Sequence, residues 1–203
     1  MRKNSKMTWE FCFIQYAIIC LLSLKLFVFL FFALASHEIA HVLAGKLVNV
    51  RAKRITIGMF YGSVEFEKDI FMMTPIEKFI ISIAGPAINI LSGIALAYID
   101  AKYALVLIVI GLANLIPILP TDGAQIVSAC IDMFTKNKYV SYSITSIIGM
   151  VIGLYVTYVF DMIYDPFWCV FMAYFYAMNI SWLFYGKQIL EEKYDETISR
   201  RNC

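Results

Sequence analysis

The sequence predicts an all-α polytopic membrane protein with about six transmembrane helices. Of its 203 residues, 61% are hydrophobic and the mean hydropathy is +0.74, whereas soluble domains are about 45–50% apolar. Apolar runs long enough to cross a bilayer recur along the chain, separated by short charged or proline-containing turns. We expect one membrane domain, residues 1–186, followed by a short cytoplasmic tail, residues 187–203.

The first apolar stretch is too long for one membrane helix. Residues 11–45 would form a helix of about 52 Å, against a hydrocarbon core of about 30 Å. Lys25 and its neighbours are the natural place for a break. The stretch therefore predicts a tight pair of helices, 9–23 and 26–46.

A small β-hairpin is predicted between the second and third helices. Over residues 55–67, β-branched and aromatic residues alternate with small or polar ones around Tyr61-Gly62. This alternation is typical of two paired strands. An ordinary interfacial loop is the alternative.

Four further spans follow, and the fourth helix of the chain is expected to be broken. Pro117 and Pro120 remove backbone donors and cannot lie in an intact helix. Irregular backbone at membrane depth is tolerated only against protein or a watery cavity. Pro75 and Pro166 suit helix starts. The predicted spans are 76–98, 103–119, 141–160 and 166–185.

The basic residues predict the orientation, because cytoplasmic loops are enriched in Lys and Arg. With six spans and a cytoplasmic N-terminus, only Lys25 and Lys102 of the 17 basic residues would lie on the outer side. We therefore expect a multi-pass protein of a bacterial-type cell membrane with both termini in the cytoplasm.

The chain contains one H-E-x-x-H pattern, at the end of an apolar run. His37 and His41 are four residues apart, so on a helix they share a face and can reach one metal ion. Glu38 then lies beside the metal, where it can take a proton from activated water. Both histidines of the protein are in this motif. A chance surface or capping role is the alternative.

Asp122 is the candidate for a third protein ligand. A catalytic zinc takes three protein ligands and keeps its fourth position for water. Asp122 lies in the broken segment, at the membrane level expected for the histidines. A capping or turn aspartate before Gly123 is the alternative.

Three motifs together resemble the site-2 protease family of intramembrane zinc metalloproteases. They are H-E-I-A-H at 37–41, A-G-P-A-I-N at 84–89 and N-L-I-P-I-L-P-T-D-G at 114–123. Residues 62–65 and the compact six-span layout look most like the stage IV sporulation protein FB group. The resemblance implies one Zn²⁺ per chain and a tentative link to sporulation.

The resemblance also implies roles for single residues. It makes His37, His41 and Asp122 zinc ligands and Glu38 the catalytic acid/base. Asn114 would help to hold the substrate or the oxyanion, or else make a polar hydrogen bond between helices. Asn89, beside the glycine and proline of the second motif, would serve packing and backbone support or support the substrate.

The expected activity is hydrolysis of peptide bonds in membrane-embedded or membrane-associated proteins near the cytoplasmic face. It would be a form of regulated intramembrane proteolysis, for example of a membrane-bound transcription factor precursor. The strand-like residues 55–67 would offer an edge to an unwound substrate. The expected partners are that substrate, the lipid bilayer and an inhibitory membrane protein, with no nucleic acid.

Two other classes of function stay open at this point. One is a soluble-facing zinc protease anchored by helices, although the loops are too short to hold its cleft. The other is a catalytically inactive or metal-transporting membrane protein with a zinc site. The position of Glu38 argues against the second class, because a transport site does not need an acid beside its first histidine.

Overall fold

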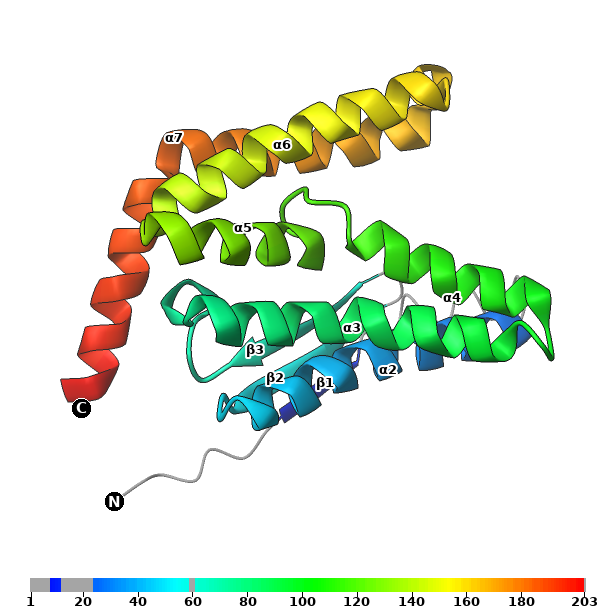
Figure 1. Ribbon diagram of the computed structural model, residues 1–203, viewed down its shortest axis with the longest axis horizontal. Coiled ribbons are helices and arrows are strands. Elements are labelled where there is room, and N and C mark those ends of the chain that lie inside the picture. The colour runs from blue at the N-terminus through cyan, green and yellow to red at the C-terminus, as the bar shows by residue number, and fades with distance from the viewer. Residues whose placement is uncertain (1–7, 12–23, 59–60, 203) are drawn as a thin grey trace. The chain divides into compact units, whose positions relative to one another are not determined.

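The computed structural model describes residues 8–11, 24–58 and 61–202. The chain divides into two compact units. The first contains residues 1–70 and 80–113, and the second contains residues 71–79 and 114–203. Helix α3 (Pro75–Leu96) begins in the second unit and continues into the first. Figure 1 labels the elements of both units.

The first unit contains a three-stranded sheet in the order β1-β2-β3. Strand β1 (Thr8–Phe11) pairs in parallel with β2 (Ala52–Ile57), and β3 (Gly62–Phe66) pairs antiparallel with β2. The predicted hairpin is therefore confirmed. Its turn is closed by a hydrogen bond of 2.8 Å from Gly58 N to Tyr61 O.

Helix α2 (Leu24–Leu47) packs along the hairpin. Ala35 and Val42 are buried against Ile55 and Ile57 of β2. The two helix residues are seven apart and the two strand residues are two apart, so each pair lies on one face of its element. This small core attaches the helix that carries the H-E-x-x-H motif to the sheet.

Helices α3 and α4 (Ala101–Asn114) complete the first unit and run side by side (Figure 1). Their contact is close because glycines face backbone: a Cβ on Gly93 would lie 2.9 Å from Ala104 O, and one on Gly111 would lie 2.9 Å from Pro86 O. Small residues allow this approach between membrane helices. Asp100 caps α4 by accepting hydrogen bonds from the amides of the next turn.

The second unit contains α5 (Asp122–Thr135), α6 (Lys138–Val159) and α7 (Pro166–Asn202). Helices α6 and α7 lie side by side (Figure 1). The start of α3 belongs here and carries a capping box, in which Thr74 and Glu77 each accept a hydrogen bond from the other's amide. Two 3-10 turns, Ile70–Met72 and Met162–Tyr164, lie in the connections.

Several predicted boundaries are corrected. Residues 9–11 form strand β1 instead of helix, because their amides pair with β2; the rest of the predicted span, 12–23, lies outside the described residues. Helix α4 ends at Asn114 instead of residue 119, because the prolines that follow cannot donate. Helix α7 continues to Asn202 instead of ending near residue 185, since helix formers such as Glu and Lys follow Gly186.

Three helices in the described part of the chain are long and apolar enough to cross a membrane. They are Val28–Leu47, Pro75–Leu96 and Lys138–Val159, and the apolar helix Ala101–Asn114 is shorter. The six-span topology with cytoplasmic termini remains a prediction.

Candidate metal centre

The polar residues of the H-E-x-x-H motif are buried in α2. His37 and Glu38 are each 4% exposed and His41 is 6% exposed. The two imidazoles lie on the same helical face, with ring centroids 4.8 Å apart and an interplanar angle of 79°. Burial of three such groups in one helical turn is costly unless they have hydrogen bonds or a ligand.

Each histidine ring is anchored through its Nδ1 atom by helix α3. Nδ1 of His41 lies 2.7 Å from the carbonyl oxygen of Ile81, and Nδ1 of His37 lies 3.2 Å from the carboxamide of Asn89. A carbonyl only accepts, so Nδ1 of His41 donates the hydrogen and Nε2 carries the lone pair. This is the tautomer that metal-binding histidines adopt.

The orientation of the Asn89 amide follows from its surroundings. With Nδ2 facing His37, the Oδ1 atom of Asn89 is buried without a hydrogen-bond partner in the described structure. Turning the amide over lets Oδ1 accept the Nδ1 hydrogen of His37, and the two orientations have nearly the same shape. Asn89 then anchors His37 as the Ile81 carbonyl anchors His41.

Gly85 leaves room for both imidazole rings to direct their Nε2 atoms toward helix α3. A Cβ on Gly85 would overlap Nε2 of His37 and Nε2 of His41. The two Nε2 atoms therefore converge on one place beside the backbone of α3. Two imidazole nitrogens held in this way are suitable ligands for zinc, which is bound by His, Cys and carboxylate groups.

Glu38 lies against the first residue of β3. A Cβ on Gly62 would overlap its carboxylate. The hairpin therefore brings the edge strand β3 to the carboxylate that follows the first histidine. Within the described residues, β3 pairs only with β2.

Asp122 and Asn114 belong to the second unit. Asp122 is the first residue of α5, and the residue before it, Thr121, is the N-cap and accepts a hydrogen bond from the amide of Ala124. Since Thr121 caps the helix, the capping role considered for Asp122 is already filled. Gly123 is required here, because a Cβ would overlap the carbonyl oxygen of Leu115. Asn114 is the last residue of α4.

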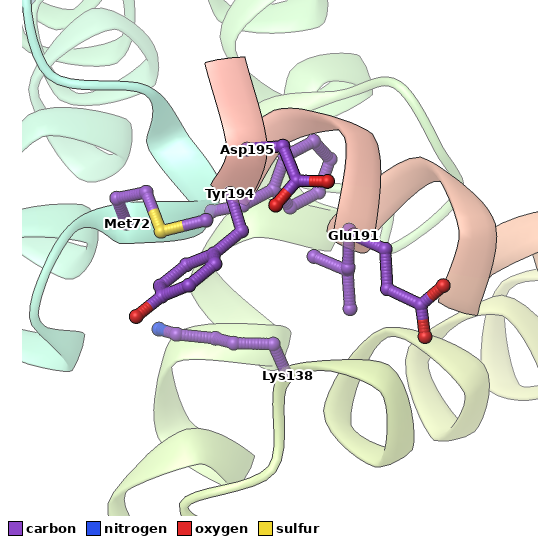
Figure 2. A pocket seen from close by; sticks show the side chains of 7 residues that line it. Met72, Lys138, Glu191, Tyr194 and Asp195 are labelled. Carbon is purple, nitrogen blue, oxygen red and sulfur yellow. The ribbon is translucent and has the colours of Figure 1, made fainter. Parts of the chain in front are cut away.

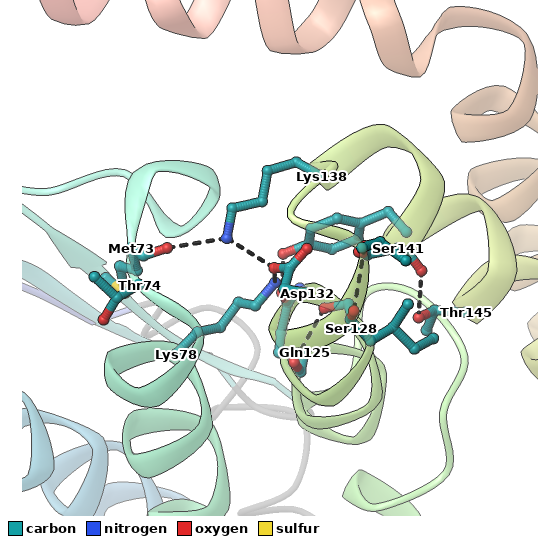
Figure 3. A network of polar contacts seen from close by, with 12 residues as sticks. Met73, Thr74, Lys78, Gln125, Ser128, Asp132, Lys138, Ser141 and Thr145 are labelled. Atoms are coloured by element: carbon teal, nitrogen blue, oxygen red, sulfur yellow. Dashed lines mark hydrogen bonds and ion pairs between the residues drawn. The ribbon is translucent and has the colours of Figure 1, made fainter.

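The second unit contains another buried polar cluster (Figure 3). Asp132 Oδ2 accepts hydrogen bonds from Nζ of Lys78, at 2.6 Å, and from Nζ of Lys138, at 2.7 Å. Although burial by itself raises the pKa of Asp132, the hydrogen bonds from Lys138 and Lys78 bring it below the usual value. The Lys78 ammonium also lies 4.5 Å from the ring centroid of Tyr142.

A hollow of about 610 Å³ lies on the second unit next to this cluster and shares Lys138 with it (Figure 2). Lys138 gives it a positive charge, and Glu191 and Asp195 give it negative charges. Its lining residues are Phe71, Met72, Lys138, Leu190, Glu191, Tyr194 and Asp195.

Sequence reasoning missed Asn179 of α7. Its side chain is fully buried and binds the backbone of Leu119 in the broken segment. An asparagine inside an apolar run was a usable signal, because polar residues in membrane helices commonly bind a partner inside the protein.

The chain has sequence similarity to a curated protein named as a metalloprotease. No protein-family model matches the chain. A curated relative from Synechocystis sp., named a "putative zinc metalloprotease", is 28% identical over 137 residues. The match covers 61% of this chain and 36% of the relative, so the chain spans about a third of the relative's length.

A solved structure extends the comparison to the fold. The Site-2 Protease from Methanocaldococcus jannaschii is similar with a TM-score of 0.60 and 21% sequence identity, over 93% of each chain. The chain therefore has the fold of a site-2 protease. Its sequence is similar to that of a protein named as a zinc metalloprotease.

Proposed function

We propose that this protein is an intramembrane zinc endopeptidase of the site-2 protease family. It hydrolyses peptide bonds of membrane-embedded or membrane-associated proteins near the cytoplasmic face. The observation that carries the proposal is the convergence of the His37 and His41 Nε2 atoms beside Gly85. The buried carboxylate of Glu38, in the same helical turn, supplies the acid/base group.

The zinc ligands in this proposal are His37, His41 and Asp122. The first two are supported by their anchored Nδ1 atoms. Asp122 is supported by its place directly after the broken segment and by Thr121, which caps α5 in its stead. When bound, zinc polarises the scissile carbonyl and lowers the pKa of a water molecule toward about 7.

Glu38 moves the proton. Its carboxylate takes a proton from the attacking water and gives it to the leaving nitrogen, first as a general base and then, as the carboxylic acid, as a general acid. Glu38 is only 4% exposed, so bulk water has little access to its carboxylate.

The substrate is an extended stretch of a membrane protein. A helical substrate must unwind first, because its amides are hydrogen-bonded within the helix and shielded. Strand β3 supports the next step, since an added strand would gain main-chain hydrogen bonds at its edge. Gly62 begins β3 beside Glu38, so a substrate on this edge would pass the acid/base carboxylate. Asn114 is proposed to assist in holding substrate.

The membrane setting of the proposal is a six-span protein with both termini in the cytoplasm. It is supported by the three helices long enough to cross a bilayer and by the distribution of Lys and Arg. Its regulation by an inhibitory membrane partner, and the release of a membrane-bound transcription factor precursor, are parts of the same proposal.

The test uses the purified full chain in proteoliposomes. The wild-type protein is expected to hold one zinc per chain by elemental analysis and to cleave single-span substrates. The Glu38→Gln variant is expected to keep its zinc and lose at least about 100-fold in cleavage rate, because the acid/base group is gone. Glu192→Gln, at an exposed carboxylate of α7, is the matched control and should cleave normally.

Two results would count against the proposal. Substantial cleavage by Glu38→Gln would reject the acid/base role. Zinc binding by the wild-type chain without cleavage of any substrate would favour an inactive or metal-transporting protein. Where cleavage is found, substrates that co-purify with Glu38→Gln would identify the natural targets.

A further inference from the structure

The broken segment between α4 and α5, residues 115–121, needs partners for its backbone. Prolines 117 and 120 interrupt the helix, so several amides and carbonyls have no helical partner. Leu119 is only 7% exposed. Backbone groups buried in this way must find hydrogen bonds elsewhere in the protein.

Asn179 of α7 supplies both hydrogen bonds of Leu119. The Leu119 amide donates to Oδ1 of Asn179 at 3.3 Å, and Nδ2 of Asn179 donates to the Leu119 carbonyl at 3.2 Å. Nδ2 also donates to Phe175 O on its own helix, at 2.7 Å. A carboxamide can do this because it has a donor and an acceptor side by side.

The contact is deeply buried. Asn179 is 0% exposed, and the adjacent core contains Leu119, Ala124, Tyr142 and Trp182. In such surroundings an unsatisfied amide or carbonyl costs about 1–3 kcal/mol. Leu119 therefore has a strong preference for the one position that satisfies both of its backbone groups.

Hydrogen bonds and close packing in the rest of the segment fix the chain between Leu119 and Asp122. The Thr121 amide donates to Ile118 O at 2.9 Å, and its hydroxyl donates to Ile116 O. On the other side, Gly149 of α6 lets that helix approach the carbonyl oxygen of Pro117 closely. The φ angle of Pro120 is fixed by its ring. Few soft torsions therefore separate Leu119 from the first residue of α5.

We propose that Asn179 is a positioning residue for Asp122, acting through Leu119 and the turn that follows it. This inference rests on the proposed function, in which Asp122 is a zinc ligand. Helices α6 and α7 then have a role in the site: they hold the segment that delivers the third ligand.

The test measures zinc affinity by competition with a chelator on the full chain in detergent. Asn179→Leu removes both hydrogen bonds while keeping a similar volume, and it should weaken zinc binding about 10-fold, the low end for outer-shell partners. Asn179→Asp keeps the acceptor but loses the donor, so its zinc affinity should fall between those of the wild type and Asn179→Leu. If Asn179→Leu folds poorly, the zinc affinity of Asn179→Asp provides the test instead. Ser181→Leu, an exposed site on the same helix, should bind zinc as the wild type does.

Two further measurements distinguish a positioning role of Asn179 from a purely structural role. Cobalt(II) in place of zinc should give an altered visible spectrum in Asn179→Leu, because the ligand geometry changes. In a double-mutant cycle, Asn179→Leu should have little further effect on zinc affinity once Asp122→Ala is present. Additive effects, or unchanged affinity and spectrum in Asn179→Leu, would overturn the inference. A wild-type chain that holds no zinc would instead overturn the proposed function itself.

Discussion

Two buried polar clusters in the described part of the chain, one in each unit, arrange their polar groups in opposite ways. In the first unit, a backbone carbonyl and a carboxamide anchor His41 and His37, and the remaining ring nitrogens converge beside Gly85. In the second unit, two ammonium groups converge on Asp132. The first cluster directs its ring nitrogens at a shared point, while the second directs its charged groups at one another.

This difference separates the proposed ligand site from a structural cluster. Neither burial nor the presence of titratable groups distinguishes the two, because both clusters are buried and both contain such groups. The direction of the ligand atoms does distinguish them. The comparison predicts that mutations in the second unit's cluster change stability, whereas mutations beside the histidines change zinc affinity.

The largest expected effect is the loss of stability in Asp132→Ala. The variant would leave Lys78, which is 0% exposed, without its carboxylate, and breaking a buried pair in this way costs about 3–5 kcal/mol. Denaturant titration in detergent measures the free energy of unfolding. Asp195→Ala, at an exposed carboxylate, is the control. A matching loss of zinc affinity in folded Asp132→Ala would show that the two clusters are not separate in function.

The next effect is on zinc affinity in Asn89→Leu. Loss of the carboxamide frees the His37 ring, and outer-shell partners of zinc ligands contribute about 10–100-fold in affinity, or about 1.4–2.7 kcal/mol. Chelator competition measures this change. Asn89→Asp should restore tight binding, because a carboxylate accepts the same hydrogen from Nδ1. If the leucine and aspartate variants bind zinc equally, Asn89 does not orient His37.

The smallest effect is expected at the ion pair between Lys53 and Glu65 on the hairpin. Their Nζ and Oε1 atoms are 2.6 Å apart, but both side chains are exposed by more than a third. Exposed pairs contribute about 0.2–1 kcal/mol. Lys53→Ala should therefore lower the free energy of unfolding by no more than that, with unchanged zinc affinity. A larger loss of unfolding free energy would mean that an ion pair stabilises the hairpin as strongly as the ion pairs of Asp132 stabilise the second unit.

The parts of the site that could be predicted from sequence are those encoded locally. His37 and His41 share a face because of helical spacing, which places Glu38 next to the first of them, and Pro117 and Pro120 must interrupt a helix. The hairpin also follows from local alternation. Each of these inferences depends on one helix or on two strands that are neighbours in the sequence, so contacts with distant residues are not needed for it.

The parts that could not be predicted depend on pairings between distant residues. Nothing near Asn179 in the sequence indicates that it binds Leu119, and nothing near residue 89 indicates that its amide faces His37. Strand β1 was predicted as helix because its neighbours are apolar, yet its conformation is determined by β2. Helix α7 was predicted to end near Gly186, and only the structure shows that it continues.

The parallel pairing of β1 with β2 has a consequence for how the first unit assembles. Thr8 pairs with Arg54, so the pairing closes a long loop of chain, and α2 lies within that loop. Closing such a loop carries an entropic cost that a local hairpin largely avoids. On this basis we expect β2 and β3 to associate before β1 pairs with β2. The helix that carries His37 and His41 thus lies inside a loop that we expect the sheet to close last.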